Sequence, residues 1–122
     1  MSIAIKRVYE PAAASDGCRV LVDRLWPRGL KKDDVALDLW IKELAPSAAL
    51  RQWFGHDAAR WEGFRQRYAG ELDKRGLHWR PLAEHAAKHP VTLLYAARDE
   101  GHNNAVVLKS YLENWLRTHG PR

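Results

Sequence analysis

Apolar and polar residues change their spacing along the chain, and the changes predict strands and helices in alternation. Residues 3–8 (IAIKRV) alternate in polarity, and residues 19–23 (RVLVD) form a short β-branched run, so both are predicted strands. Residues 91–97 (VTLLYAA) are nearly all apolar, as expected for a strand covered on both faces. The runs near residues 20 and 93 should therefore lie inside a sheet.

Helical spacing predicts the remaining elements. Ser47 stands where the N-cap of a short helix ending at Gly55 is expected. Apolar residues recur every three or four positions over residues 57–74, which predicts an amphipathic helix. Pro81 should open a helix that continues to about residue 88, and a closing helix should run from Asn104 to about residue 119.

Residues 37–44 (LDLWIKEL) fit two patterns. Positions 37, 40, 41 and 44 share a helical face, whereas positions 37, 39 and 41 share one face of a strand. We favour a strand, because Pro46 follows closely and so short a helix is marginal. The whole pattern predicts an α/β fold: a small open, mostly parallel sheet of about four strands flanked by helices, in a single domain covering residues 1–122.

Composition narrows the class of protein. A chain of 122 residues with 46% hydrophobic content suits one core. No apolar run approaches the roughly 18 residues that span a bilayer, and the lone Cys18 excludes an internal disulfide, so we expect a cytoplasmic protein away from membranes. His85 and His89 have metal-ligand spacing but lack the glutamate pattern of a zinc protease, so we expect no metal. The sequence contains no P-loop or GxGxxG motif and leaves the cofactor and oligomeric state unassigned.

The positive charge is concentrated early in the chain. The net charge is +5, and residues 1–32 hold seven Lys and Arg against three acidic residues. Much of this excess lies in residues 23–32 (DRLWPRGLKK), directly after the second strand. There Pro27 suits the second position of a type I turn and Gly29 the fourth, with Arg28 at the tip. An arginine held on a rigid turn suits phosphate or carboxylate.

A second polar cluster, residues 98–104 (RDEGHNN), follows the late apolar strand. Ligands of open α/β sheets gather beyond the carboxyl ends of the strands. If the two apolar strands are parallel neighbours, this cluster and the 23–32 loop meet across one mouth. Asn103 or Asn104 should also cap the last helix, whose free amides attract anions.

These two loops form the candidate site. Asp23 and His102 are the candidate catalytic acid and base. The candidate ligand-binding residues are Arg24, Trp26, Arg28, Gly29, Arg98, Asp99, Asn103 and Asn104. A simpler alternative remains open, in which Asp23 and Arg24 form an ordinary salt bridge at a strand end and the asparagines only cap a helix beside an exposed His102.

Five sequence blocks carry a family resemblance. In order they are DRLWPRGLKK, LDLWIKELAPS, LRQWFGHD, FRQRYAGEL and LLYAARDEGHNNAVVLKSYL. Over nearly the whole chain they resemble the YeaO-like branch of domain-of-unknown-function family 488. The resemblance implies a small cytoplasmic bacterial or archaeal α/β protein with residues 37–44 as a strand, and it implies no activity. Other branches carry a cysteine-rich pattern after the late strand, where this chain has Tyr95, Ala97, His102, Asn103 and Asn104, so cysteine chemistry does not transfer.

Two functions fit the residues. The first is a small enzyme or binding domain with a site for a phosphorylated, nucleotide-like ligand. The alternative is a nucleic-acid-binding module in which the basic loop contacts the backbone and Trp26 or Trp53 stacks on bases; its cations are Arg24, Arg28, Lys31 and Lys32. A deep mouth lined by both loops favours the first function, and a flat basic face with exposed aromatic rings favours the second.

Overall fold

The computed structural model describes residues 3–119. It contains a sheet of four parallel strands in the order β1-β4-β2-β3, which confirms the predicted α/β class. The strands are β1 (Ile3–Arg7), β2 (Cys18–Leu21), β3 (Leu39–Trp40) and β4 (Val91–Tyr95). The helices are α1 (Ala48–Phe54), α2 (Trp61–Asp73), α3 (Gly76–Ala86) and α4 (Asn104–His119).

β4 lies at the centre of the sheet. It pairs with β1 on one side and with β2 on the other, and all five of its residues are buried. Val91 is level with Ile3 and with Cys18, so the three strands begin together. Their carboxyl ends therefore reach the same edge of the sheet, where the two predicted loops begin.

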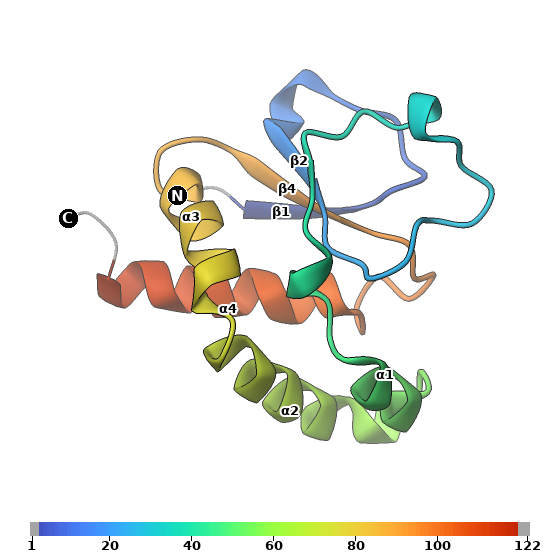
Figure 1. Ribbon diagram of the computed structural model, residues 1–122, viewed down its shortest axis with the longest axis vertical. Coiled ribbons are helices and arrows are strands. Elements are labelled where there is room, and N and C mark those ends of the chain that lie inside the picture. Colours follow the sequence, from blue (N-terminus) through green and yellow to red (C-terminus); the bar gives the residue numbers. More distant parts are fainter. Residues whose placement is uncertain (1–2, 120–122) are drawn as a thin grey trace.

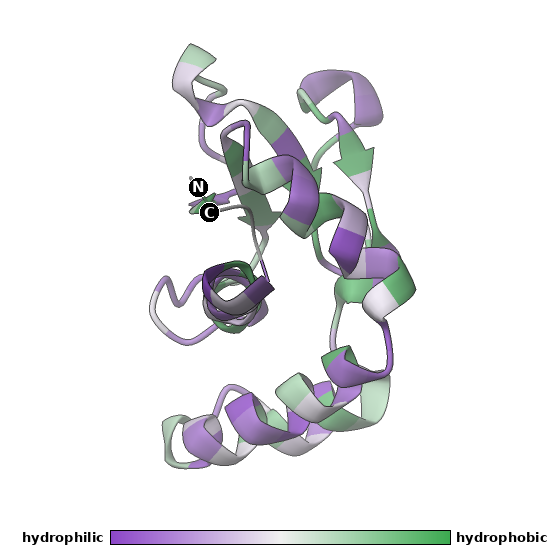
Figure 2. Cartoon of the chain, turned by 90° about the vertical axis from the view of Figure 1, so that its left-hand side faces the viewer, coloured by the Kyte–Doolittle hydropathy of each residue, from purple (hydrophilic) through white to green (hydrophobic). Residues whose placement is uncertain are grey.

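The two faces of the sheet are covered differently. One face, which carries Val20 and Leu93, packs against the apolar sides of the helices in the main core. The other face, which carries Leu21 and Leu94, is covered by the long connection after β2 through Trp26 and its neighbours. Figure 1 shows the helices towards one side and the long connections on the other. In Figure 2 the strands are largely hydrophobic while the helices carry both colours, as amphipathic helices should.

The segment predicted as a strand over residues 37–44 is mostly not a strand. Only Leu39–Trp40 pair with β2, and Lys42–Leu44 form a 3-10 turn. Trp40 packs on the loop-covered face, whereas Leu44 is fully buried in the main core and accepts a hydrogen bond from the Tyr68 hydroxyl. The chain leaves the sheet here because it must cross to the helical side.

The helix expected to open at Pro81 begins instead at Gly76. Trp79, in its first turns, is 4% exposed and donates its indole N–H to the carbonyl of Leu72 at 2.8 Å. That anchoring places a turn of helix before the proline. Pro81 cannot bond the carbonyl of Leu77, but Leu77 is 92% exposed, so water can reach this end of the helix. No helix in residues 3–119 has the length and apolarity to cross a membrane.

Candidate functional site

A crevice forms where the chain leaves β2 and β4 in opposite directions. After β2 the chain turns onto the loop-covered face through Trp26 and Leu30. After β4 it turns to the helical face, where α4 buries Ala105 and Leu108. Because neighbouring parallel strands send their chains to opposite faces, the gap between their ends stays open, as in other open α/β sheets.

Asp23 bridges this crevice. One oxygen of its carboxylate accepts the backbone N–H of Ala96 at 2.9 Å, and the other accepts the side-chain N–H of Asn104 at 3.0 Å. The same amide group of Asn104 also donates to the carbonyl of Val22 at 3.1 Å. Asp23 thus joins the end of β2 to the end of β4 and the start of α4, and it forms no ion pair with Arg24.

Burial raises the pKa of Asp23 above its usual value of 3.8. The hydrogen bonds from Asn104 and Ala96 and the charge of Arg51 oppose this shift without cancelling it. A carboxyl group at the floor of a crevice with a raised pKa suits hydrogen bonding or proton transfer.

The two predicted loops meet in one cavity of about 920 Å³. This volume lies in the range of about 300–1,000 Å³ typical of sites for small molecules. The predicted site residues that line it are Asp23, Arg24, Trp26, Arg28, Arg98, Asp99, His102, Asn103 and Asn104. Gly29 does not line it, and nothing lies within 4 Å of where its side chain would be.

The turn that carries Arg28 differs from the predicted one. Leu30 N–H points to the carbonyl of Pro27 at 3.5 Å, so Pro27 is the first residue of the turn and Gly29 the third. Gly29 has a φ of +84°, the conformation that a type II turn requires at its third position. Arg28 still occupies the tip, and its carbonyl accepts the Tyr9 hydroxyl at 2.9 Å. The glycine therefore shapes the turn and does not contact the cavity.

Four arginines surround the cavity without protein partners. Arg24 and Arg28 come from the loop after β2, Arg98 from the loop after β4, and Arg51 from α1. Within residues 3–119 no hydrogen bond or ion pair engages any of these four guanidinium groups. In the described part of the chain, only two carboxylates line the cavity. They are Asp23, whose oxygens accept hydrogen bonds from Ala96 and Asn104, and Asp99. The lining is accordingly cationic.

The loop after β4 is held by its own side chains. Asn103 is 4% exposed; its side-chain oxygen accepts Val106 N–H at 3.1 Å and its amide donates to the Asp99 carbonyl at 2.9 Å. Asn103 is therefore the cap of α4, while Asn104 bonds to Asp23. The Asp99 carboxylate accepts the N–H groups of Gly101 and His102, which lower its pKa, and lies 3.1 Å from the His102 ring.

A wall that the sequence prediction missed comes from α1 and the turn after it. Arg51, Gln52 and His56 line the cavity, together with apolar contributions from Pro46 and Phe54. Ser47 caps α1 as expected, accepting Leu50 N–H at 3.1 Å. Polar residues on a short helix give no sequence signal of a site, since they are equally common on any exposed helix.

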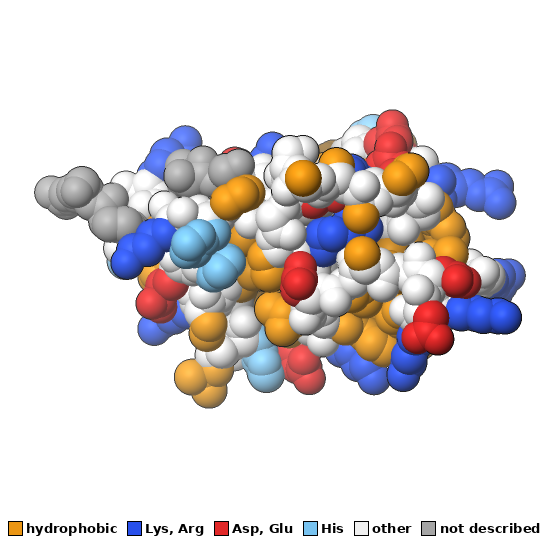
Figure 3. All heavy atoms as spheres, turned by 90° about the horizontal axis from the view of Figure 1, so that it is seen from above, with side chains coloured by type: hydrophobic (Ala, Val, Ile, Leu, Met, Phe, Trp, Pro, Cys, Tyr) orange, Lys and Arg blue, Asp and Glu red, His pale blue; other side chains and the backbone are white. Residues whose placement is uncertain are grey.

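The aromatic residues proposed to stack on nucleic acid are mostly covered. Trp26 is half-buried, donates its indole N–H to the Leu30 carbonyl at 2.6 Å and packs edge-on against Trp40. The ring of Trp53 lies under the guanidinium of Arg67, 3.9 Å from its centroid. On the face drawn in Figure 3, basic side chains lie among acidic and hydrophobic ones and form no continuous stripe.

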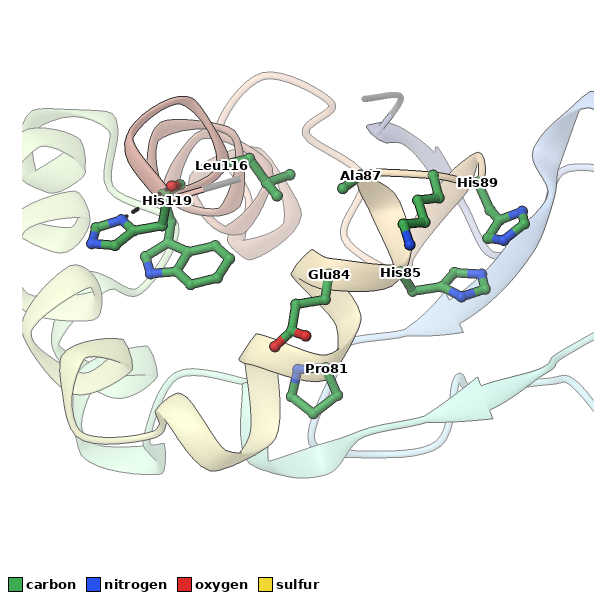
Figure 4. Close-up of a pocket in the computed structure, with 9 residues that line it drawn as sticks. Pro81, Glu84, His85, Ala87, His89, Leu116 and His119 are labelled. Carbon is green, nitrogen blue, oxygen red and sulfur yellow. Dashed lines mark hydrogen bonds between the residues drawn. The ribbon is translucent and has the colours of Figure 1, made fainter. Parts of the chain in front are cut away.

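A second cavity of about 620 Å³ lies between α3 and α4. Its lining includes His85 and His89, whose rings stack with centroids 4.8 Å apart, and His119. In Figure 4, His85 and His89 lie on one side of α3 and His119 lies across the cavity on α4, so the three rings do not converge. Among residues 3–119 no group of three or more potential ligands could hold a metal ion.

The geometry defines a small parallel α/β protein with an arginine-lined cavity at the carboxyl edge of its sheet. The model of the family described as "Inactive DUF488-N3 subclade" matches residues 2–121, so the chain belongs to this family, and the resemblance to family 488 is confirmed.

The chain is also similar to curated relatives over nearly their full lengths. It is 48% identical to "Uncharacterized protein YeaO" of Escherichia coli (strain K12) over 118 residues, which cover 97% of this chain and 99% of that protein. It is 41% identical to "Uncharacterized protein Rv3073c" of Mycobacterium tuberculosis (strain H37Rv) over 112 residues, covering 90% and 92%. No solved structure matches the chain.

Proposed function

We propose that the cavity between the two loops binds a small phosphorylated ligand. The observation that carries the proposal is the set of four arginines, from three separate segments, that line one cavity and whose guanidinium groups form no hydrogen bond or ion pair within residues 3–119. Arginine binds phosphate bidentately. A guanidinium that is already paired with a carboxylate would have to break that pair before it could bind phosphate, and its affinity for phosphate would be lower. The start of α4 adds the favourable end of a helix dipole beside Arg98.

The proposal is for binding without turnover. The family description includes the word "inactive", which favours a retained binding site over catalysis. In this proposal Asp23 holds the two loops together, and His102 donates or accepts a hydrogen bond at the rim. In the enzymatic alternative, Asp23 and His102 would act as the acid and base on the bound ligand. We place the protein in the cytoplasm, consistent with its single cysteine.

A thermal-shift screen tests the proposal. The probes are nucleotides, sugar phosphates, inorganic phosphate and short single-stranded DNA, with the wild type and Arg28→Ala. Arg65→Ala is the matched control, because Arg65 pairs only with Glu62 on the exposed side of α2. A ligand at ten times its Kd stabilises the fold by about 1.4 kcal/mol, which raises the Tm of a domain of this size by about 5 °C.

The outcomes separate the functions. A shift with a small phosphorylated compound that Arg28→Ala removes and Arg65→Ala retains supports the cavity. A salt-sensitive shift with DNA alone favours nucleic-acid binding, whose affinity falls steeply with ionic strength. The absence of any shift contradicts both functions.

A further inference from the structure

Anion binding by the four arginines accounts for Arg51 but not for the other polar residues of the wall that α1 contributes to the cavity. Arg51, Gln52 and His56 are exposed and line the cavity from the end of this helix and the turn that follows it. His56 has a φ of +57°, and it is the one non-glycine residue of residues 3–119 with a positive φ. A residue with a side chain occupies this left-handed region at a conformational cost that glycine avoids.

Gly55 and His56, both with a positive φ, are the central residues of a turn closed by the Asp57 N–H and the Phe54 carbonyl, so the conformation of His56 belongs to the turn itself. Gly55 already ends the helix, with a φ of +50° and its N–H bonded to the Arg51 carbonyl at 3.0 Å. A chain that only had to turn here could carry glycine or asparagine at position 56 without the cost. The turn therefore sets the backbone conformation at position 56, but it does not require a histidine side chain there.

The neighbouring residues hold the turn firmly. Asp57 N–H bonds to the Phe54 carbonyl at 2.9 Å, and the Asp57 carboxylate accepts Ala59 N–H at 2.9 Å. The His56 ring lies 6.1 Å from the Phe54 ring, tilted by 51°. The backbone of the turn is thus held at the edge of the cavity, and the imidazole stays exposed there. Residues held in uncommon backbone conformations by the surrounding structure are found more often at ligand sites than elsewhere.

The cavity is also larger and less polar than phosphate alone requires. Its volume is about 920 Å³, and its lining includes the apolar residues Pro46, Phe54 and Ala97. Apolar surfaces of this kind suit a flat ring. The side chains of Gln52 and His56 each have a hydrogen-bond donor and an acceptor. The edge of a heterocyclic base also has donors and acceptors, so the two can pair.

We propose that the ligand is a nucleoside monophosphate, and that Gln52 and His56 bind its base while the arginines bind its phosphate. This inference rests on the proposed function. It adds the class of ligand and assigns the α1 wall the recognition of the base.

Titration calorimetry with AMP, GMP, CMP, UMP and ribose 5-phosphate tests the inference. The wild type should bind at least one nucleotide about tenfold more tightly than ribose 5-phosphate, because the base adds contacts of about one hydrogen bond and one ring face. His56→Gly suits the left-handed φ and should fold at least as well as the wild type. This variant or Gln52→Ala should lose most of that advantage and keep the affinity for ribose 5-phosphate. The control His78→Ala, on the exposed side of α3, should bind as the wild type does.

Three results would overturn the inference. The first is that the wild type binds nucleotides and ribose 5-phosphate with equal affinity and that Arg28→Ala loses both. This result would exclude recognition of the base and would still support the anion site. Unchanged nucleotide binding in both His56→Gly and Gln52→Ala removes the role of the α1 wall. No binding of any phosphorylated probe removes this inference and the proposed function together.

Discussion

Asp23→Ala should destabilise the protein because it disconnects the two loops of the site. The substitution removes the acceptors of Ala96 N–H and of the Asn104 amide, which lie 2.9 and 3.0 Å from the carboxylate. Hydrogen bonds to a charged group contribute about 1.5–3 kcal/mol each. Part of that gain is offset by the cost of burying the carboxylate, the same cost that raises the pKa of Asp23. The net loss should be about 2–4 kcal/mol.

This loss converts to a measurable change in Tm. An unfolding entropy of about 2.1 cal/mol/K per residue amounts to about 0.26 kcal/mol/K for the whole chain. A loss of 2–4 kcal/mol should therefore lower the Tm by about 8–16 °C in calorimetry or circular dichroism at pH 7. A Tm within about 2 °C of the wild type would show that the carboxylate does not hold the loops, since a surface substitution has an effect of that size.

The pH dependence of stability gives an independent check on Asp23. A carboxyl group whose pKa is raised by folding binds its proton more tightly in the folded state, so its contribution to stability is largest below pH 3.8 and falls as pH rises through the folded pKa. The free energy of unfolding of the wild type minus that of Asp23→Asn should therefore be larger at pH 3.5 than at pH 7 in urea titrations. Taking this difference cancels the titration of the other carboxyl groups. A difference that is constant or grows with pH would refute the assignment.

Three further substitutions test the frame around the site. Asp16→Ala should lower the free energy of unfolding by about 3–5 kcal/mol, because it leaves the buried Arg19 guanidinium without its carboxylate. Folding lowers the pKa of Asp16 to about 2, so the wild type should keep this stabilisation above pH 4 and lose it in acid unfolding as the pH falls towards 2. Gly17→Ala should prevent stable folding, detected by loss of a cooperative thermal transition, because the new methyl group would lie 2.2 Å from the Pro90 carbonyl oxygen at a φ of +64°. Asn103→Ala should lower stability by about 1–2 kcal/mol in urea by uncapping α4, and an unchanged midpoint would refute the cap.

The sequence pointed to the two loops on the condition that the two apolar strands are parallel neighbours, and it did not predict the order β1-β4-β2-β3. Residues 19–23 and 91–97 are apolar enough to be neighbours inside a parallel sheet, and a parallel sheet brings their ends to one edge. The polar residues that follow each run were therefore sufficient to locate the cavity. This inference needed only local pattern and the geometry of parallel pairing.

The α1 wall was not predictable, because no strand end leads to it. Arg51 and His56 reach the cavity only because the chain crosses from β3 to the helical face and back towards the crevice, a path set by the burial of Leu44 and Phe54. The same crossing explains why residues 37–44 have a strand-like pattern but pair over only two residues. Tertiary packing determines both the position of the α1 wall and the short length of β3, and no local sequence pattern predicts it.

The most direct test of the cavity is a nuclear magnetic resonance titration of the ¹⁵N-labelled protein with the phosphorylated compound that gives the largest thermal shift. Our account predicts that the amide signals that move belong to residues 24–30, 51–56 and 96–104, with saturation at one ligand per chain. The cavity between α3 and α4 serves as an internal control, because its residues should stay unperturbed. Perturbations confined to that second cavity, or spread over the surface without saturation, would contradict the account.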